Sequence, residues 1–171
     1  NSATSGITVV PAPPANLVAS TPQAPSSGDA GRPLDVTWTV QNSSDQPTSA
    51  TQWNDELWLS RDAVFGPGDT RLLGRSITGG LGPRSAYPAP QSATVTLPAS
   101  ASGEYRILVR TDADGQVYER GATADNIAAS APFQVRSSNL VPPEVRPTVS
   151  TVSAGRDLPV TWTVRNTGAA P

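Results

Sequence analysis

Carboxylates are the main reactive side chains of this sequence, because most other residues that do chemistry in proteins are missing. The 171 residues include no His and no Cys, and every basic residue is an Arg. The commonest general base, the thiolate nucleophile and the Schiff-base lysine are therefore all absent. Any catalysis would have to depend on carboxylates, hydroxyls and guanidinium groups, and we predict that the chain is not an enzyme.

One acidic loop, residues 60–70, could bind calcium, a cation that takes six to eight oxygen ligands. It carries Asp62 and Asp69 beside a Gly-Pro-Gly turn sequence. The alternative is that both carboxylates accept backbone hydrogen bonds in a long connection between strands. Two carboxylates are few for a calcium site, so we favour this alternative.

A second acidic stretch, residues 112–119, invites comparison with an EF-hand calcium loop. Placing Asp114 and Gly115 at the fifth and sixth loop positions puts Arg110 at the first, where a carboxylate belongs. The EF-hand spacing therefore fails. The Asp-Gly pair is predicted instead to form the tight turn of a hairpin that leads into residues 117–118.

The acidic residues around this turn leave a second possibility open. Asp112, Glu119 and Asp125 could form a composite calcium site. The alternative is a loop that side-chain to backbone hydrogen bonds hold in place. Calcium is the only cofactor that we consider, and the sequence assigns no residue to it.

Two other groups of residues could act on or bind sugars. Asp55 and Glu56 come nearest to the paired carboxylates of a glycosidase, but neighbouring strand residues point to opposite faces of a sheet. They cannot flank one bond and are not catalytic. Trp58, together with Tyr118, could stack on a sugar if exposed. We favour ordinary packing of Trp58 beneath a loop.

Short strands must position all of these residues. Alternation of apolar and polar residues between turn signals predicts strands over residues 16–21, 34–42, 53–60, 71–77, 93–97, 104–111 and 132–136. We predict an all-β fold, an immunoglobulin-like antiparallel β-sandwich of seven or eight strands with no helix. The predicted core contains Trp38, Trp53, Leu57, Val95, Tyr105 and Ile107.

Part of the sequence occurs twice. Residues 30–42, AGRPLDVTWTVQN, return as residues 154–166, AGRDLPVTWTVRN. Residues 16–18, Asn-Leu-Val, return as residues 139–141, one residue out of step. A match of this length that includes a tryptophan indicates a structural repeat.

The repeat sets the expected domain boundaries. Residues 1–15 are predicted to be the last strand of a preceding repeat and a Pro-rich linker. Residues 16–136 form the complete sandwich, and residues 137–171 form a linker and the truncated start of the next repeat.

The truncated repeat has an apolar set of residues with no partner sheet. Val160, Trp162 and Val164 alternate in the same way as their counterparts in the complete repeat. We expect them to be disordered, to pack on a neighbouring molecule, or to be completed by residues 7–10 of another copy.

Several ordered motifs together resemble a known family. They are NLV, AGRxLxVxWTVxN, WxDxLWLSxD, GDTxLLG, GxYxIxVxTD, QVYE and DN, in that order along the complete repeat. This set is similar to the bacterial cell-adhesion-related domain, CARDB, an immunoglobulin-like module repeated in large surface and secreted proteins. The resemblance implies a sandwich that serves as spacer, stalk or adhesion module, with no catalytic residue to carry over. Residues 124–127 depart from it, because the family often has a longer Asn-rich stretch there.

We therefore expect a non-catalytic structural or adhesive spacer module of a large secreted or cell-surface bacterial repeat protein. Its expected partners are neighbouring repeats of the same chain and, as a further candidate, a cell-surface glycan or protein. The alternatives are a ligand-binding module, for carbohydrate or calcium-dependent protein contact, and an accessory domain of a secreted hydrolase. A net charge of -2 gives no basic surface for nucleic acid. No apolar run reaches the roughly 20 residues that cross a bilayer.

Overall fold

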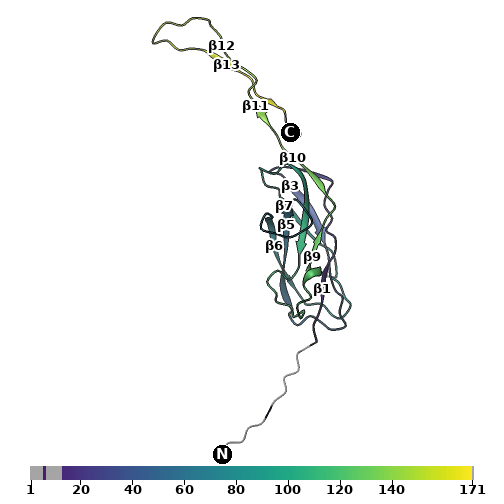
Figure 1. Cartoon of the computed structure of the whole chain (residues 1–171). Helices are drawn as coiled ribbons and strands as arrows, with labels where there is room; N and C mark the ends of the chain where they lie inside the picture. Colours follow the sequence, from purple (N-terminus) through teal and green to yellow (C-terminus); the bar gives the residue numbers. More distant parts are fainter. Residues whose placement is uncertain (1–5, 7–12, 171) are drawn as a thin grey trace, which may run out of the picture.

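The computed structural model describes residue 6 and residues 13–170, which fold into a two-layered β-sandwich followed by a long two-stranded ribbon (Figure 1). One layer of the sandwich contains β1 (Leu17–Ala19), β3 (Pro33–Trp38), β4 (Val40–Asn42) and β7 (Gln91–Thr96). The other contains β2 (Ser27–Asp29), β5 (Gln52–Ser60), β6 (Thr70–Thr78), β8 (Gly103–Arg110), β9 (Ile127–Ala129) and β10 (Phe133–Arg136). The ribbon contains β11 (Leu140–Val141), β12 (Val145–Pro147), β13 (Val160–Trp162) and β14 (Arg165–Asn166).

Pairing within the layers is antiparallel with one exception. The larger sheet has the order β2-β10-β8-β5-β6, and β9 pairs with β8. In the other layer β3 pairs with β7 and β1 pairs with β4, while the bridge between Gln23 and Thr37 extends the ladder. β2 runs parallel to β10, because the chain crosses from one layer to the other at this strand.

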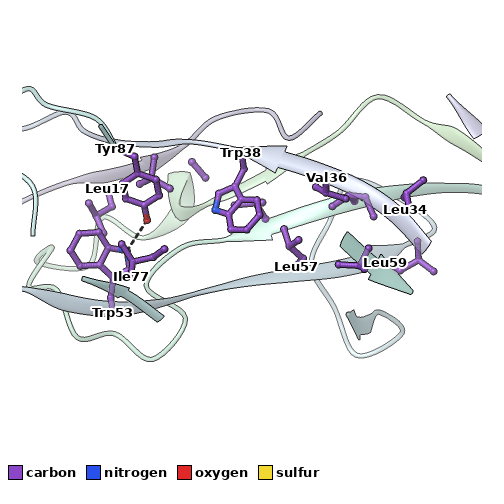
Figure 2. Packing of buried hydrophobic residues seen from close by; sticks show 14 of the residues in the cluster. Leu17, Leu34, Val36, Trp38, Trp53, Leu57, Leu59, Ile77 and Tyr87 are labelled. Atoms are coloured by element: carbon purple, nitrogen blue, oxygen red, sulfur yellow. Dashed lines mark hydrogen bonds between the residues drawn. The ribbon is translucent and has the colours of Figure 1, made fainter. Parts of the chain in front are cut away.

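The core lies between the layers because β3 and β5 each turn alternate residues inward. In β3, Val36 and Trp38 are buried while Thr37 between them is exposed. Figure 2 shows Trp38 facing the side of β5 that carries Trp53 and Leu57. Burial of each large apolar side chain contributes roughly 1.5–3 kcal/mol, which stabilises the sandwich without disulfides.

The prediction of an all-β, immunoglobulin-like sandwich is confirmed. Five of the six residues named for the core are buried, namely Trp38, Trp53, Leu57, Val95 and Ile107. Tyr105 is only half-buried, and the guanidinium group of Arg61 lies 4.0 Å from the centre of its ring.

The structure corrects several local predictions. Residues 117–118 form no strand: after the turn at Gly115, the chain continues as a loop, and the carbonyl of Tyr118 accepts a hydrogen bond from the amide of Ala15. The predicted strand over residues 34–42 is interrupted at Thr39. The chain also has a short 3-10 helix, η1 (Ala124–Asn126), where no helix was expected.

The ribbon extends beyond the end of the sandwich at which β10 finishes, whereas β1 lies toward the opposite end (Figure 1). Val160, Trp162 and Val164 are exposed on the ribbon and do not enter the core of the sandwich. Pairing with residues 7–10 of another copy, and the predicted strand near the N-terminus, lie outside the described residues.

Candidate functional site

One buried carboxylate joins the two layers of the sandwich. Asp55 is 1% exposed, and its Oδ2 accepts hydrogen bonds of 2.8 Å from both the indole of Trp38 and the hydroxyl of Tyr87. Its Oδ1 accepts a 2.7 Å hydrogen bond from the hydroxyl of Thr111. Burial raises the pKa of Asp55, and the hydrogen bonds offset only part of this effect. The surroundings of Asp55 suit a structural role, because the core encloses it.

Glu56 lies on the opposite face of the same strand, as expected for neighbouring strand residues. Its carboxylate forms an ion pair of 2.8 Å with Arg71 and accepts a 3.0 Å hydrogen bond from the indole of Trp58. Asp55 and Glu56 are therefore separated by the sheet and cannot act on one bond.

Trp58 lies on this outer face and is half-buried. The ring of Phe65, from the loop between β5 and β6, meets it edge to face with 5.0 Å between ring centres. The loop thus packs on the indole that a sugar would need for stacking. Tyr118 is 41% exposed but belongs to the separate loop that follows β8.

The two carboxylates of the 60–70 loop are engaged by their own backbone. Oδ1 of Asp62 accepts a 2.8 Å hydrogen bond from the amide of Val64. Oδ2 of Asp69 accepts a 2.8 Å hydrogen bond from the amide of Gly66. These contacts close two short turns and account for both acidic residues.

Asp112 also organises a turn. Its backbone has a φ of 46°, in the left-handed region, and its carboxylate accepts hydrogen bonds from the amides of Gln116, at 2.7 Å, and Val117, at 3.1 Å. Burial raises its pKa, and the nearby Asp114 adds to the effect.

Glu119 connects this loop to the strand at which the sandwich begins. It is 3% exposed, and its two carboxylate oxygens accept hydrogen bonds from the amide of Leu17, at 2.5 Å, and the side chain of Asn126, at 2.6 Å. Burial is the main cause that raises its pKa, and the charges of Asp112 and Asp125 raise it further. The charges of Asp112 and Asp125 therefore both act on Glu119.

Two amide side chains, those of Asn16 and Asn126, contact the carboxylates of Asp125 and Glu119. We call these four residues the acidic cluster. The Nδ2 of Asn16 donates a 2.9 Å hydrogen bond to Asp125, and the Nδ2 of Asn126 donates to Glu119. The Oδ1 atoms of both Asn residues are buried and have no hydrogen-bond partner. Across residues 6 and 13–170, no three carboxylate, His or Cys side chains converge as a metal centre of such ligands would require. The two amide oxygens were not identifiable from the sequence.

A second hydrogen-bond network, centred on Asn42, holds the segment at which the sandwich begins. The same contacts recur in the ribbon. Asn42 is fully buried, and its Oδ1 accepts a hydrogen bond from the amide of Asn16 while its Nδ2 donates to the carbonyl of Gln46. In the ribbon, Asn166 makes the same two contacts, with the amide of Asn139 and the carbonyl of Ala170.

The strand register recurs in the same way. Leu17 pairs with Asn42, and Leu140 pairs with Asn166. The bridge of Gln23 to Thr37 corresponds to the pair of Arg146 and Thr161. The pairing within the ribbon thus follows the pairing of β1, β3 and β4.

Within the described part of the chain, no helix has the length and apolar character needed to span a membrane. No protein-family model and no curated protein matches the sequence.

Solved structures share the fold. The crystal structure of the CARDB domain of a Pyrococcus furiosus protein, in complex with di-metal ions, has a TM-score of 0.52 at 16% identity, over 71% of this chain and 94% of that one. The solution structure of that domain has a TM-score of 0.48 at 17% identity over the same shares. A β-glucosidase from Listeria innocua has a TM-score of 0.45 at 13% identity, over 71% of this chain and 16% of the enzyme. The first comparison confirms that the fold is CARDB-like.

Proposed function

We propose that the chain is a non-catalytic structural module of a secreted or cell-surface bacterial repeat protein, in which it sets the distance between other parts. Its partners are neighbouring repeats. The observation that carries this proposal is the recurrence of the Asn16 and Asn42 hydrogen bonds at Asn139 and Asn166. Because both sequence and hydrogen bonding recur, the ribbon is interpreted as the beginning of a second unit.

The geometry of the two ends favours a spacer. The chain enters the sandwich at the end that carries β1 and leaves from the opposite end after β10 (Figure 1). Only residues 137–139 separate β10 from β11. Units connected in this way follow one another head to tail, so each unit adds its own length to the array.

The carboxylates of the sandwich support a role without catalysis. Asp55 is enclosed by the core, and Asp62, Asp69 and Asp112 accept hydrogen bonds from turn amides. Contacts of this kind hold the core and the turns in place, which favours a structural role for these carboxylates.

Removal of residues 16–138 from a protein that carries this chain tests the proposal, because Asn16 and Asn139 occupy equivalent positions. We expect the loss of one unit to impair surface display or reach. An unrelated β-sandwich of similar length should restore it. Failure of this replacement, with rescue only by the native unit, would instead indicate a specific binding module.

A second candidate function is a calcium-stabilised joint at the acidic cluster. The observation in its favour is the pair of buried, unpartnered amide oxygens of Asn16 and Asn126 beside the carboxylates of Glu119 and Asp125. Calcium accepts amide and carboxylate oxygens as ligands. Burial is the main cause of the raised pKa of Glu119, and a bound cation would relieve the repulsion from Asp112 and Asp125 that adds to it.

Thermal unfolding with calcium chloride or with EDTA tests this second candidate. A ligand that binds only the folded state raises the melting temperature. We expect calcium to raise it in the native chain and in the control variant Asp69→Asn, but not in Asp125→Asn. Equal melting temperatures with calcium and EDTA would exclude the site.

A further inference from the structure

We propose that the apolar face of the ribbon, residues 139–166, receives a sheet that is equivalent to β5 and β8 but does not belong to the sandwich of residues 16–136. A carboxylate equivalent to Asp55 would accept the indole hydrogen of Trp162. This inference rests on the proposed function, because it names the chemistry by which one repeat is completed.

Exposure identifies the ribbon face as an uncovered core. Trp38 is 2% exposed and its counterpart Trp162 is 66% exposed. Leu17, Leu34, Val36 and Val40 are 0–4% exposed, whereas Leu140, Leu158, Val160 and Val164 are 38–66% exposed. The same residue types in the same register are therefore buried in one copy and open in the other. An apolar face of this kind marks an interaction surface.

The interface inside the sandwich indicates what covers this face. In the complete copy, β5 and β8 cover the apolar side chains, and Asp55 accepts the indole hydrogen of Trp38 at 2.8 Å. A buried indole N–H without an acceptor costs about 1–3 kcal/mol. The partner of Trp162 therefore needs an acceptor within an apolar sheet face, which a uniformly apolar surface does not offer.

The ribbon cannot use the sheet of its own sandwich. To replace β1, strand β11 would have to reach the end of the sandwich that lies far from β10 (Figure 1). The three residues between β10 and β11 span about 10 Å at most. The nine-residue strand β5 alone is about 30 Å long. The sheet must therefore come from outside this sandwich.

A second ribbon is a poorer partner because it offers no acceptor for the indole hydrogen of Trp162. Two ribbons packed face to face would bury their apolar side chains against each other. Each Trp162 would then face apolar side chains rather than a carboxylate equivalent to Asp55. Self-association of the chain through two ribbons would contradict the proposal, and the experiment below detects it.

The chain supplies its own probe for this proposal. Pro171 aligns with Pro47 in the repeat, so extension of the full chain after Pro171 with a second copy of residues 48–136 offers a sheet equivalent to β5 and β8 in register. Hydrogen exchange measured by mass spectrometry reports on the ribbon amides of residues 158–164. We expect their exchange to slow by about 100-fold or more relative to the unextended chain.

The variant Trp162→Asp is the matched control. In the extended chain it should abolish the protection of the ribbon, whereas in the unextended chain it should leave the unfolding of the sandwich unchanged. A ribbon that stays unprotected in the extended chain, or protection that survives Trp162→Asp, overturns the proposal.

Addition of the second copy of residues 48–136 as a separate polypeptide, diluted from urea with the full chain, gives a second readout. A 1:1 complex that Trp162→Asp abolishes supports the interface. A dimer of the unextended chain that Trp162→Asp disrupts would identify a second ribbon as the occupant and would also overturn the proposal. Neither negative result affects the spacer role, which replacement of the whole unit tests separately.

Discussion

The indole nitrogen of Trp38 donates a 2.8 Å hydrogen bond to Oδ2 of Asp55, and this contact connects the two layers of the sandwich through the middle of its core. Both side chains are almost completely buried. The hydroxyls of Tyr87 and Thr111 also donate to the carboxylate. Loss of any donor leaves a buried acceptor less satisfied, so substitutions in this polar cluster should measurably lower the free energy of unfolding.

The substitution Trp38→Phe should destabilise the sandwich by about 1–3 kcal/mol, because it removes one donor from a buried carboxylate. The smaller ring also leaves unfilled space, which adds to the loss. Urea unfolding followed by circular dichroism measures the change. Trp162→Phe, at the equivalent position in the ribbon, should change the free energy of unfolding by less than about 0.5 kcal/mol. Similar losses in the two variants would contradict the assignment of one tryptophan to the core and the other to an open face.

The charge of Asp55 should make the sandwich less stable as the pH rises from acid. Its pKa in the unfolded chain is about 3.8, and burial raises the pKa in the folded state. The folded state therefore binds the proton more tightly. The contribution of Asp55 is most favourable below the unfolded pKa, falls as the pH rises through the raised folded pKa, and is constant above it.

The variant Asp55→Asn isolates this effect, because Asp112 and Glu119 also have raised pKa values and act in the same direction. The hydroxyl of Thr111 can rotate to accept from the new amide, so the variant should fold. We expect the native chain to lose stability relative to Asp55→Asn as the pH rises from about 3.5. Urea unfolding at a series of pH values measures the difference, and a difference that does not vary with pH would exclude this linkage.

The sequence predicts the faces of the long strands because alternation reports burial directly. It places Asp55 on the same face as Trp53 and Leu57, and the structure buries all three. The partners of Asp55 are not predictable in this way. Tyr87 lies between β6 and β7 in no predicted strand, and only the closed fold brings its hydroxyl to the carboxylate.

The sequence predicts only the part of the acidic cluster that lies close together along the chain. Proximity along the chain associates Glu119 with Asp125, and the charge of Asp125 adds to the effect of burial that raises the pKa of Glu119. The hydrogen bond that Glu119 accepts from the amide of Leu17, across a separation of 102 residues, depends on where the chain enters the sandwich. No local pattern carries that information, so neither the contact nor the buried oxygen of Asn16 could be predicted.

The strand β2 escapes prediction because its inward residue is a glycine. A Cβ atom at Gly28 would lie 2.8 Å from Cδ1 of Leu97 and 3.1 Å from Cδ1 of Leu34. Gly28→Ala should therefore force these leucines to move and cost about 1–3 kcal/mol of stability. Gly66→Ala is the matched control, because a Cβ there meets no atom within 4 Å. Thermal unfolding compares the two, and equal melting temperatures would show that the contact between β2 and the leucines is loose.

The buried amide of Asn42 should be among the most sensitive polar positions of the sandwich. Its Nδ2 donates to the carbonyls of Gln46, at 2.6 Å, and Gly82, at 3.0 Å, and its Oδ1 accepts from the amides of Asn16 and Ser44, both at 3.2 Å. Asn42→Ala removes all four contacts from backbone groups around a fully buried side chain, so we expect a loss of about 2–5 kcal/mol.

The variant Asn166→Ala gives the comparison for this substitution. It removes the corresponding contacts with the amide of Asn139 and the carbonyl of Ala170, but in a ribbon that no second layer covers. The sandwich should therefore unfold as in the native chain, while hydrogen exchange of the Asn139 amide accelerates, because that amide loses its acceptor. Urea unfolding and hydrogen exchange measured on both variants separate the two effects. A loss of sandwich stability in Asn166→Ala as large as that in Asn42→Ala would mean that the ribbon supports the sandwich, and the two copies would then be parts of one cooperative unit.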